Sequence, residues 1–157
     1  MIKRIALGAA LAFASTTAFA ADLPQKPYLT LEAARGIAAA AEAKARAEGW
    51  PAVIAITDDA GLPLLLLRMD QAMVPAGVEL APGKARTAAL FRRPTGVLED
   101  AINGNRPAVI TARGFTPMRG GLPITVGGQV VGGIGVSADT PQHDEAIAQA
   151  GLAAAPK

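Results

Sequence analysis

The sequence predicts an α+β domain built on a five-stranded, mostly antiparallel sheet flanked by helices. Short apolar runs occur in pairs joined by Asp- or Gly-rich turns, which is typical of antiparallel hairpins. Helical patterns lie before, between and after these pairs, and do not alternate with single strands as they do in a βαβ repeat. The chain has 157 residues and no internal repeat, so one domain accounts for its length.

The first predicted helix covers residues 31–48. Thr30 suits the N-cap position, and Gly49 supplies the stop. The segment is rich in Ala, Glu, Lys and Arg, which are good helix formers. Its apolar residues recur at i, i+3, i+4 and i+7, and this spacing predicts one buried face.

A β-hairpin follows this helix. Residues 52–57 are rich in β-branched side chains, residues 58–61 form an Asp/Gly turn, and residues 62–69 form a second apolar run. Residues 64–67 are all leucine, so they are apolar on both faces. We therefore expect this strand to be covered on both sides.

Two helices and a short strand fill the middle of the chain. Pro82 suits the start of a helix over residues 81–91, and Pro94 separates it from a shorter helix over residues 95–102. The β-branched run at residues 108–112 predicts the third strand of the sheet. Residues 113–121 are rich in Gly, Pro and Arg and predict a loop.

A second hairpin and a last helix complete the predicted fold. Residues 122–126 and 129–137 are joined by Gly127 and Gly128, which suit a primed two-residue turn. Thr140 can then cap a helix that opens at Pro141 and extends to about residue 150.

Three further glycines, at positions 132, 133 and 135, lie inside the last predicted strand. A dinucleotide-binding loop would need a helix directly after its glycines, and here the strand continues instead. Glycines within a strand indicate close approach of another group. A packed helix and a flat ligand lying on the sheet are both consistent with them.

The first twenty residues have the features of a cleavable signal peptide. Lys3 and Arg4 precede an apolar run, and Ala18 and Ala20 form the small-x-small pattern of a cleavage site. The run is shorter than the roughly 20 residues of a spanning helix. We expect a periplasmic or secreted protein, with residues 21–157 as a single domain and no membrane span after cleavage.

Charge and cysteine content exclude several classes of function. The chain has 15 Lys and Arg against 13 Asp and Glu, and loss of Lys3 and Arg4 with the signal would make it formally neutral. Overall basicity therefore does not support nucleic acid as a partner. The chain has no cysteine, which excludes disulfides, thiolate metal sites, Fe–S clusters and cysteine nucleophiles. It has one histidine, which excludes a multi-histidine zinc site.

A local excess of positive charge lies in the second half of the chain. Residues 84–119 contain seven cations and only two acids, Glu99 and Asp100. The cations are Lys84, Arg86, Arg92, Arg93, Arg106, Arg113 and Arg119. One interpretation is a solvated helix face with salt bridges. The other is an anion site, because guanidinium groups match carboxylates.

His143 lies in the first turn of the last predicted helix, with Asp144 beside it. It is either a polar surface residue or a ligand to haem or a metal, or a proton carrier. Other possible iron ligands are Met69, Met73, Met118 and Tyr28. No pair of carboxylates is spaced as an acid–base couple.

Five segments in this order resemble the GlcG/HbpS family of small haem-binding proteins. They are LTLEAA at 29–34, KARTAALFRRPT at 84–95, GGLPI at 120–124, GGIGVS at 132–137 and DEAIAQAGLAA at 144–154. A similar domain forms the C-terminal part of some corrinoid adenosyltransferases. The resemblance implies a profilin-like fold, self-association into a homo-oligomer and, for some members, haem binding. Other members belong to glycolate-utilisation gene clusters.

The family's haem iron is often associated with histidines near the N-terminal helix, and residues 31–48 contain none. The leading hypothesis is therefore an exported haem- or tetrapyrrole-binding carrier, buffer or sensor partner with His143 as the metal ligand. The macrocycle would lie against the sheet glycines, and its propionates would pair with arginines. The candidate ligand-binding residues are His143, Arg86, Arg113, Met118, Arg119 and Gly121.

Two alternatives stay open. The same arginines could serve an enzyme or accessory factor that acts on a small carboxylate such as glycolate. The domain could also be an oligomeric module without a ligand.

Overall fold

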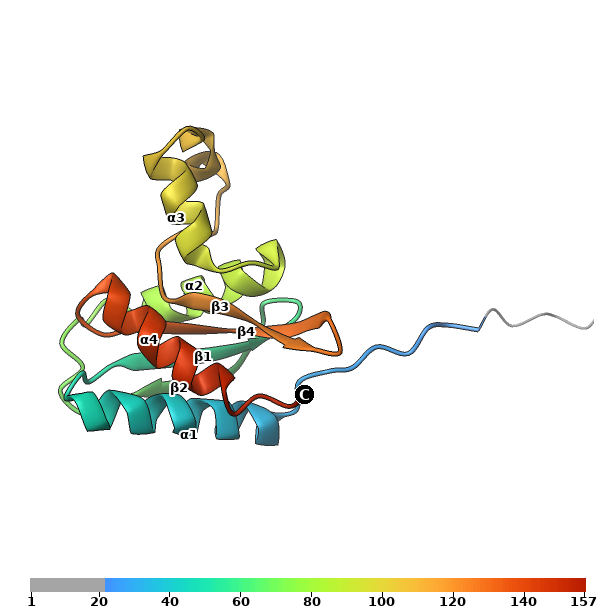
Figure 1. Cartoon of the computed structure of the whole chain (residues 1–157), viewed down its shortest axis with the longest axis horizontal. Helices are drawn as coiled ribbons and strands as arrows, with labels where there is room; N and C mark the ends of the chain where they lie inside the picture. The colour runs from blue at the N-terminus through green and yellow to red at the C-terminus, as the bar shows by residue number, and fades with distance from the viewer. Residues whose placement is uncertain (1–21) are drawn as a thin grey trace, which may run out of the picture.

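A computed structural model describes residues 22–157, and the predicted signal peptide at residues 1–20 lies outside them (Figure 1). The elements are α1 (Leu31–Glu48), β1 (Val53–Asp58), β2 (Pro63–Arg68), α2 (Gly77–Phe91), α3 (Thr95–Asn103), the 3-10 helix η1 (Pro107–Thr111), β3 (Gly121–Val126), β4 (Gln129–Ser137) and α4 (Pro141–Leu152). None of the helices in this part of the chain is long and apolar enough to cross a membrane.

The α+β class is confirmed, but the prediction of five strands is wrong. The described residues form one antiparallel sheet of four strands in the order β2-β1-β4-β3. The expected strand at residues 108–112 is instead η1, which has Pro107 in its first turn and no buried residue. Strand propensity is realised only when the side chains pack on a sheet. Here Ile110 is 69% exposed, so that packing is missing.

The helices lie on both faces of the sheet. Figure 1 shows α1 and α4 together on one face and α2 on the other, while α3 and η1 project away from the sheet. Ile37 of α1 and Ile147 of α4 pack with Ile54, Ile56 and Ile134 of the sheet in the larger core cluster. A smaller cluster joins β1 to the alanines of α2.

Strand β2 is not covered on both sides as the sequence predicts. It is an edge strand, and Leu66 on the α2 side is 51% exposed. Leu65 and Leu67 pair across the strand with Ile56 and Ile54, so they face the larger core and are half-buried. The α2 layer lies mainly over β1, β4 and β3, and this leaves the other side of β2 open.

The predicted ends of most elements are confirmed. The Thr30 hydroxyl accepts the Ala33 amide at 3.1 Å, and Gly49 ends α1 in the left-handed conformation. Gly127 and Gly128 both have positive φ, as the turn between β3 and β4 requires. Helix α2, however, begins at Gly77 and contains Pro82 within it. Its first turn forms without Pro82, because the Leu80 amide already bonds to the Ala76 carbonyl.

Helix α2 lies directly against β4 at two glycines. A Cβ added to Gly133 would be 2.2 Å from the Ala85 carbonyl oxygen, and one on Gly135 would be 2.0 Å from that of Ala81. These contacts leave no room for a side chain or for a planar ligand. The sheet glycines therefore serve helix packing, and the predicted haem surface on them is excluded.

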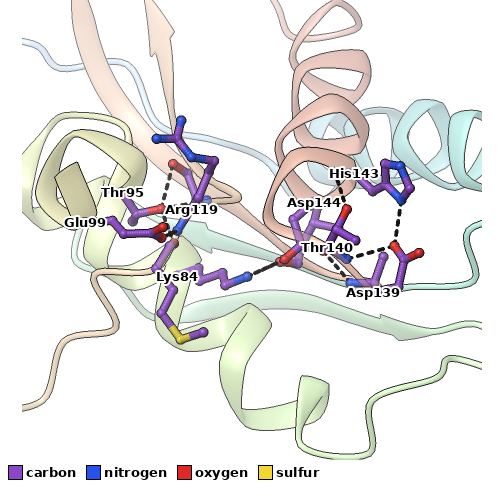
Figure 2. A network of polar contacts seen from close by, with 12 residues as sticks. Lys84, Thr95, Glu99, Arg119, Asp139, Thr140, His143 and Asp144 are labelled. Carbon is purple, nitrogen blue, oxygen red and sulfur yellow. Dashed lines mark hydrogen bonds and ion pairs between the residues drawn. The ribbon is translucent and has the colours of Figure 1, made fainter. Parts of the chain in front are cut away.

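A buried ion pair links the two helical layers at the end of β4. Lys84 of α2 is 2% exposed, and its Nζ donates to Asp144 Oδ2 at 2.6 Å and to the Val136 carbonyl at 3.0 Å (Figure 2). Asp144 of α4 also accepts the Ala138 amide at 2.6 Å. Burial raises the pKa of Asp144, although the charge and hydrogen bond of Lys84 oppose this shift. The pair holds the first turn of α4 beside the sheet.

Substitution of Gly135 with Ala should destabilise the protein, because its Cβ would overlap the Ala81 carbonyl. Overpacking of this kind costs about 1–3 kcal/mol or more. Gly36→Ala is the matched control, since its Cβ would meet nothing within 4 Å and it lies on the exposed side of α1. The control should raise stability by about 0.5–1 kcal/mol. Urea unfolding measures both, and equal stability of the two variants would contradict the packing described here.

Substitution of Lys84 with Met should lower the free energy of unfolding by about 3–5 kcal/mol, because it leaves Asp144 buried without its partner. The double variant K84M/D144L should recover part of that loss. In contrast, Lys44→Met removes a surface pair with Glu48 and should change stability by less than about 1 kcal/mol. Urea unfolding of the four proteins gives the comparison. If K84M lowers the free energy of unfolding no more than K44M does, the buried ion pair contributes little to stability.

Candidate functional site

His143 lies in the first turn of α4, as the sequence predicts. The Thr140 hydroxyl caps this turn by accepting the His143 amide at 3.2 Å. The imidazole is stacked on Trp50, with ring centroids 3.6 Å apart and planes 8° from parallel. Its side chain is 31% exposed, so one edge of the ring reaches solvent.

Asp139 orients this imidazole. Its Oδ1 lies 2.8 Å from His143 Nδ1 (Figure 2). Burial would raise the pKa of Asp139, but hydrogen bonds from His143 and the Thr140 amide lower it below its usual value. An ionised carboxylate only accepts, so Nδ1 carries the proton, and in the neutral form of the ring Nε2 presents its lone pair. Nε2 has no hydrogen-bond partner among residues 22–157.

This arrangement is the one found at metal-binding histidines, which commonly donate their second ring N–H to a carboxylate. The residues described contain no group of three His, Asp or Glu side chains that could enclose a metal ion. Haem iron needs only one or two ligands from the protein.

Met118, Arg119 and Gly121 lie near the start of α4. Met118 and Arg119 line a pocket of about 200 Å³ together with Asp139 and Asp144. Asp139, which holds the imidazole, belongs to this lining, whereas His143 itself does not. Gly121 packs against the Lys84 carbonyl, where a Cβ would be 2.6 Å from the oxygen.

The guanidinium of Arg119 is held by two carboxylates. Nη1 donates to Glu145 and Nη2 to Asp100, each at 2.8 Å. The hydrogen bonds to Glu145 and then Asp100 raise the pKa of Arg119 above its usual value. Its charge is thus balanced within the protein.

The structure does not bring Arg86 and Arg113 together with His143 in one pocket. Arg86 lies on α2 with its guanidinium carbon 5.9 Å from the Phe115 ring centroid, and Arg113 is exposed in the loop after η1. Neither forms an ion pair with any residue described.

The other candidate iron ligands differ in burial. Met69 is in the core, where its sulfur accepts the Ala52 amide at 3.4 Å. Met73 is 69% exposed and Tyr28 is 76% exposed.

Sequence reasoning missed Trp50 and Asp139 in this region, and it named Lys84 only as one of the cations in the second half of the chain, without its buried partner. The spacing of Asp139 and His143, four residues apart, is a signal that could have paired them. Lys84 falls on the same helical face as Ala81, Ala85 and Ala88, and a charged residue on such a small apolar face indicates a buried partner. No local pattern points to Trp50.

Comparison with known proteins agrees with the fold and with the resemblance of the motifs. The model of the family described as "Haem degrading protein HbpS-like" matches residues 29–153. Protein GlcG of Escherichia coli strain K12 is 41% identical over 112 residues, which cover 71% of this chain and 83% of that protein.

Two groups of solved structures are also similar. A double-mutant form of HbpS from Streptomyces reticuli has a TM-score of 0.79 and 36% identity, and covers 90% of this chain and 97% of its own. A complex of PduOC with haem has a TM-score of 0.72 and 28% identity. The match covers 82% of this chain and 95% of the PduOC chain. The family match spans nearly all of the described domain, and the chain belongs to the HbpS-like family.

Proposed function

We propose that this protein binds haem and that His143 is its iron ligand. The family to which it belongs is described as haem-degrading, and the similar PduOC structure contains haem. The observation that carries the assignment of His143 is its pairing with Asp139, which holds Nδ1 and makes Nε2 the nitrogen that the neutral ring offers to a metal. Bound haem would supply a redox-active iron at this position.

The residues around His143 fit an iron ligand in two further respects. Trp50 holds one face of the imidazole, so the ring is kept in one orientation. Thr140 caps the helical turn that carries His143, and the ion pair between Lys84 and Asp144 holds that turn beside the sheet. None of the three arginines predicted for the propionates is suited to that role here: Glu145 and Asp100 already hold Arg119, and Arg86 and Arg113 do not share a pocket with His143.

The exposure of His143 to solvent supports a carrier or buffer role. A single ligand on a side chain that is 31% exposed favours exchange of haem over permanent retention. Exposed Leu62 and Leu66 at the β2 edge support the proposed homo-oligomer, since unpaired apolar edges are sites of association. The predicted signal peptide supports a periplasmic or secreted location.

Titration of the purified protein with hemin tests the ligand. We expect a shifted Soret band, and we expect His143→Ala to abolish it or weaken binding strongly. Asp139→Asn should weaken binding by about 10–100-fold, because the carboxylate supports the ligand without touching the iron. Ile110→Ala, which removes an exposed side chain of η1, an element that contacts α3 and not α4, is the control. No Soret shift would refute haem binding, and an unchanged shift in the His143 variant would refute this ligand.

Expression of the full chain in a Gram-negative host tests the location. Intact mass of the protein from the periplasmic fraction should correspond to a chain that begins at Ala21. Substitution of Ala20 with Arg should block cleavage and leave the precursor with the membranes. Recovery of uncleaved wild-type protein from the cytoplasm would contradict export.

A further inference from the structure

A second and larger cavity lies between the end of α2, helix α3 and η1. Helix α3 and η1 belong to the part of the molecule that projects from the sheet (Figure 1). The volume of the cavity is about 390 Å³, within the range of about 300–1,000 Å³ typical of small-molecule sites. None of its lining residues belongs to α4 or to the surroundings of His143. It is therefore distinct from the proposed iron site.

The walls of this cavity are apolar. Phe91 at the end of α2 is held by an edge-to-face contact with Phe115, with ring centroids 4.9 Å apart. Leu98 of α3 is 4% exposed and forms a second fixed wall. Ala108 and Val109 come from η1 and face these walls across the cavity. A hydrocarbon group of matching size would lose its contact with water there.

Two arginines, Arg93 and Arg106, complete the lining. Neither forms an ion pair within residues 22–157. The acids of α3 do not pair with them, because Glu99 accepts the Arg119 amide and Asp100 pairs with the Arg119 guanidinium. The cavity thus combines an apolar interior with two arginines that form no ion pair among the described residues.

We propose that this cavity binds a small amphipathic carboxylate. Its hydrocarbon body would lie against Phe91 and Leu98, and its carboxylate would accept hydrogen bonds from Arg93 and Arg106. Guanidinium forks match a carboxylate in geometry as well as charge. The cavity is unsuited to haem iron, because no His, Met, Tyr or Cys lines it. The ligand is therefore a metal-free acid, and its binding does not depend on His143.

Calorimetric titration of the full protein with octanoate tests this proposal, with 1-octanol as the uncharged match. Octanoate should bind, and 1-octanol should bind at least about tenfold more weakly. The double variant R93Q/R106Q should weaken octanoate binding by about tenfold or more, while its thermal unfolding stays close to that of the wild type. The control R35Q/R68Q removes the same charge from exposed positions on α1 and β2 and should bind octanoate normally.

A third variant tests the interior. Ala112 lines the cavity, and Ala112→Phe should fill it and abolish octanoate binding in a folded protein. Hemin titration should be unaffected by R93Q/R106Q, so failure here is distinguishable from failure of the proposed function. Three results would overturn the proposal. They are an affinity for 1-octanol equal to that for octanoate, a loss of octanoate affinity in R35Q/R68Q equal to that in R93Q/R106Q, and displacement of octanoate by hemin.

Discussion

The contact between α2 and β4 determines the arrangement of the rest of the domain. Gly133 and Gly135 let the helix backbone lie on the strand, at a distance that any side chain would increase. At that distance Lys84 extends past the end of β4 and reaches Asp144 on the helix of the opposite layer. The first turn of α4 is fixed in consequence, and with it His143. A packing constraint on one face of the sheet thus positions a metal-ligand candidate near the other.

The sequence predicts local structure well where neighbours in the chain determine it. Thr30, Gly49 and the Gly127–Gly128 turn act through the backbone of adjacent residues, so their patterns are reliable. The prediction fails where a segment needs a distant partner. Residues 108–112 have the composition of a strand but no sheet edge beside them, and residues 107–111 form η1 instead. The leucines of β2 are apolar on both sides, yet only the side toward α1 is covered.

The candidate site likewise combines features that neighbouring residues determine with features that depend on distant parts of the chain. The position of His143 at a helix start follows from Thr140 and Pro141. Its partner Trp50 is distant in sequence, and nothing local indicates it. Arginine content predicts an anion patch, but only the fold shows which arginines are already paired. Arg119 is bound to two carboxylates, whereas Arg93 and Arg106 line a cavity without an ion pair among the described residues.

The stack of Trp50 on His143 has one more consequence. Each is the sole residue of its type in the chain. The ultraviolet emission of the protein therefore comes mainly from an indole in direct contact with the only imidazole. Any change at that imidazole, whether a proton gained or a metal bound, alters the electronic surroundings of the fluorophore. The protein contains its own optical reporter for this site, and no external label is needed to follow it.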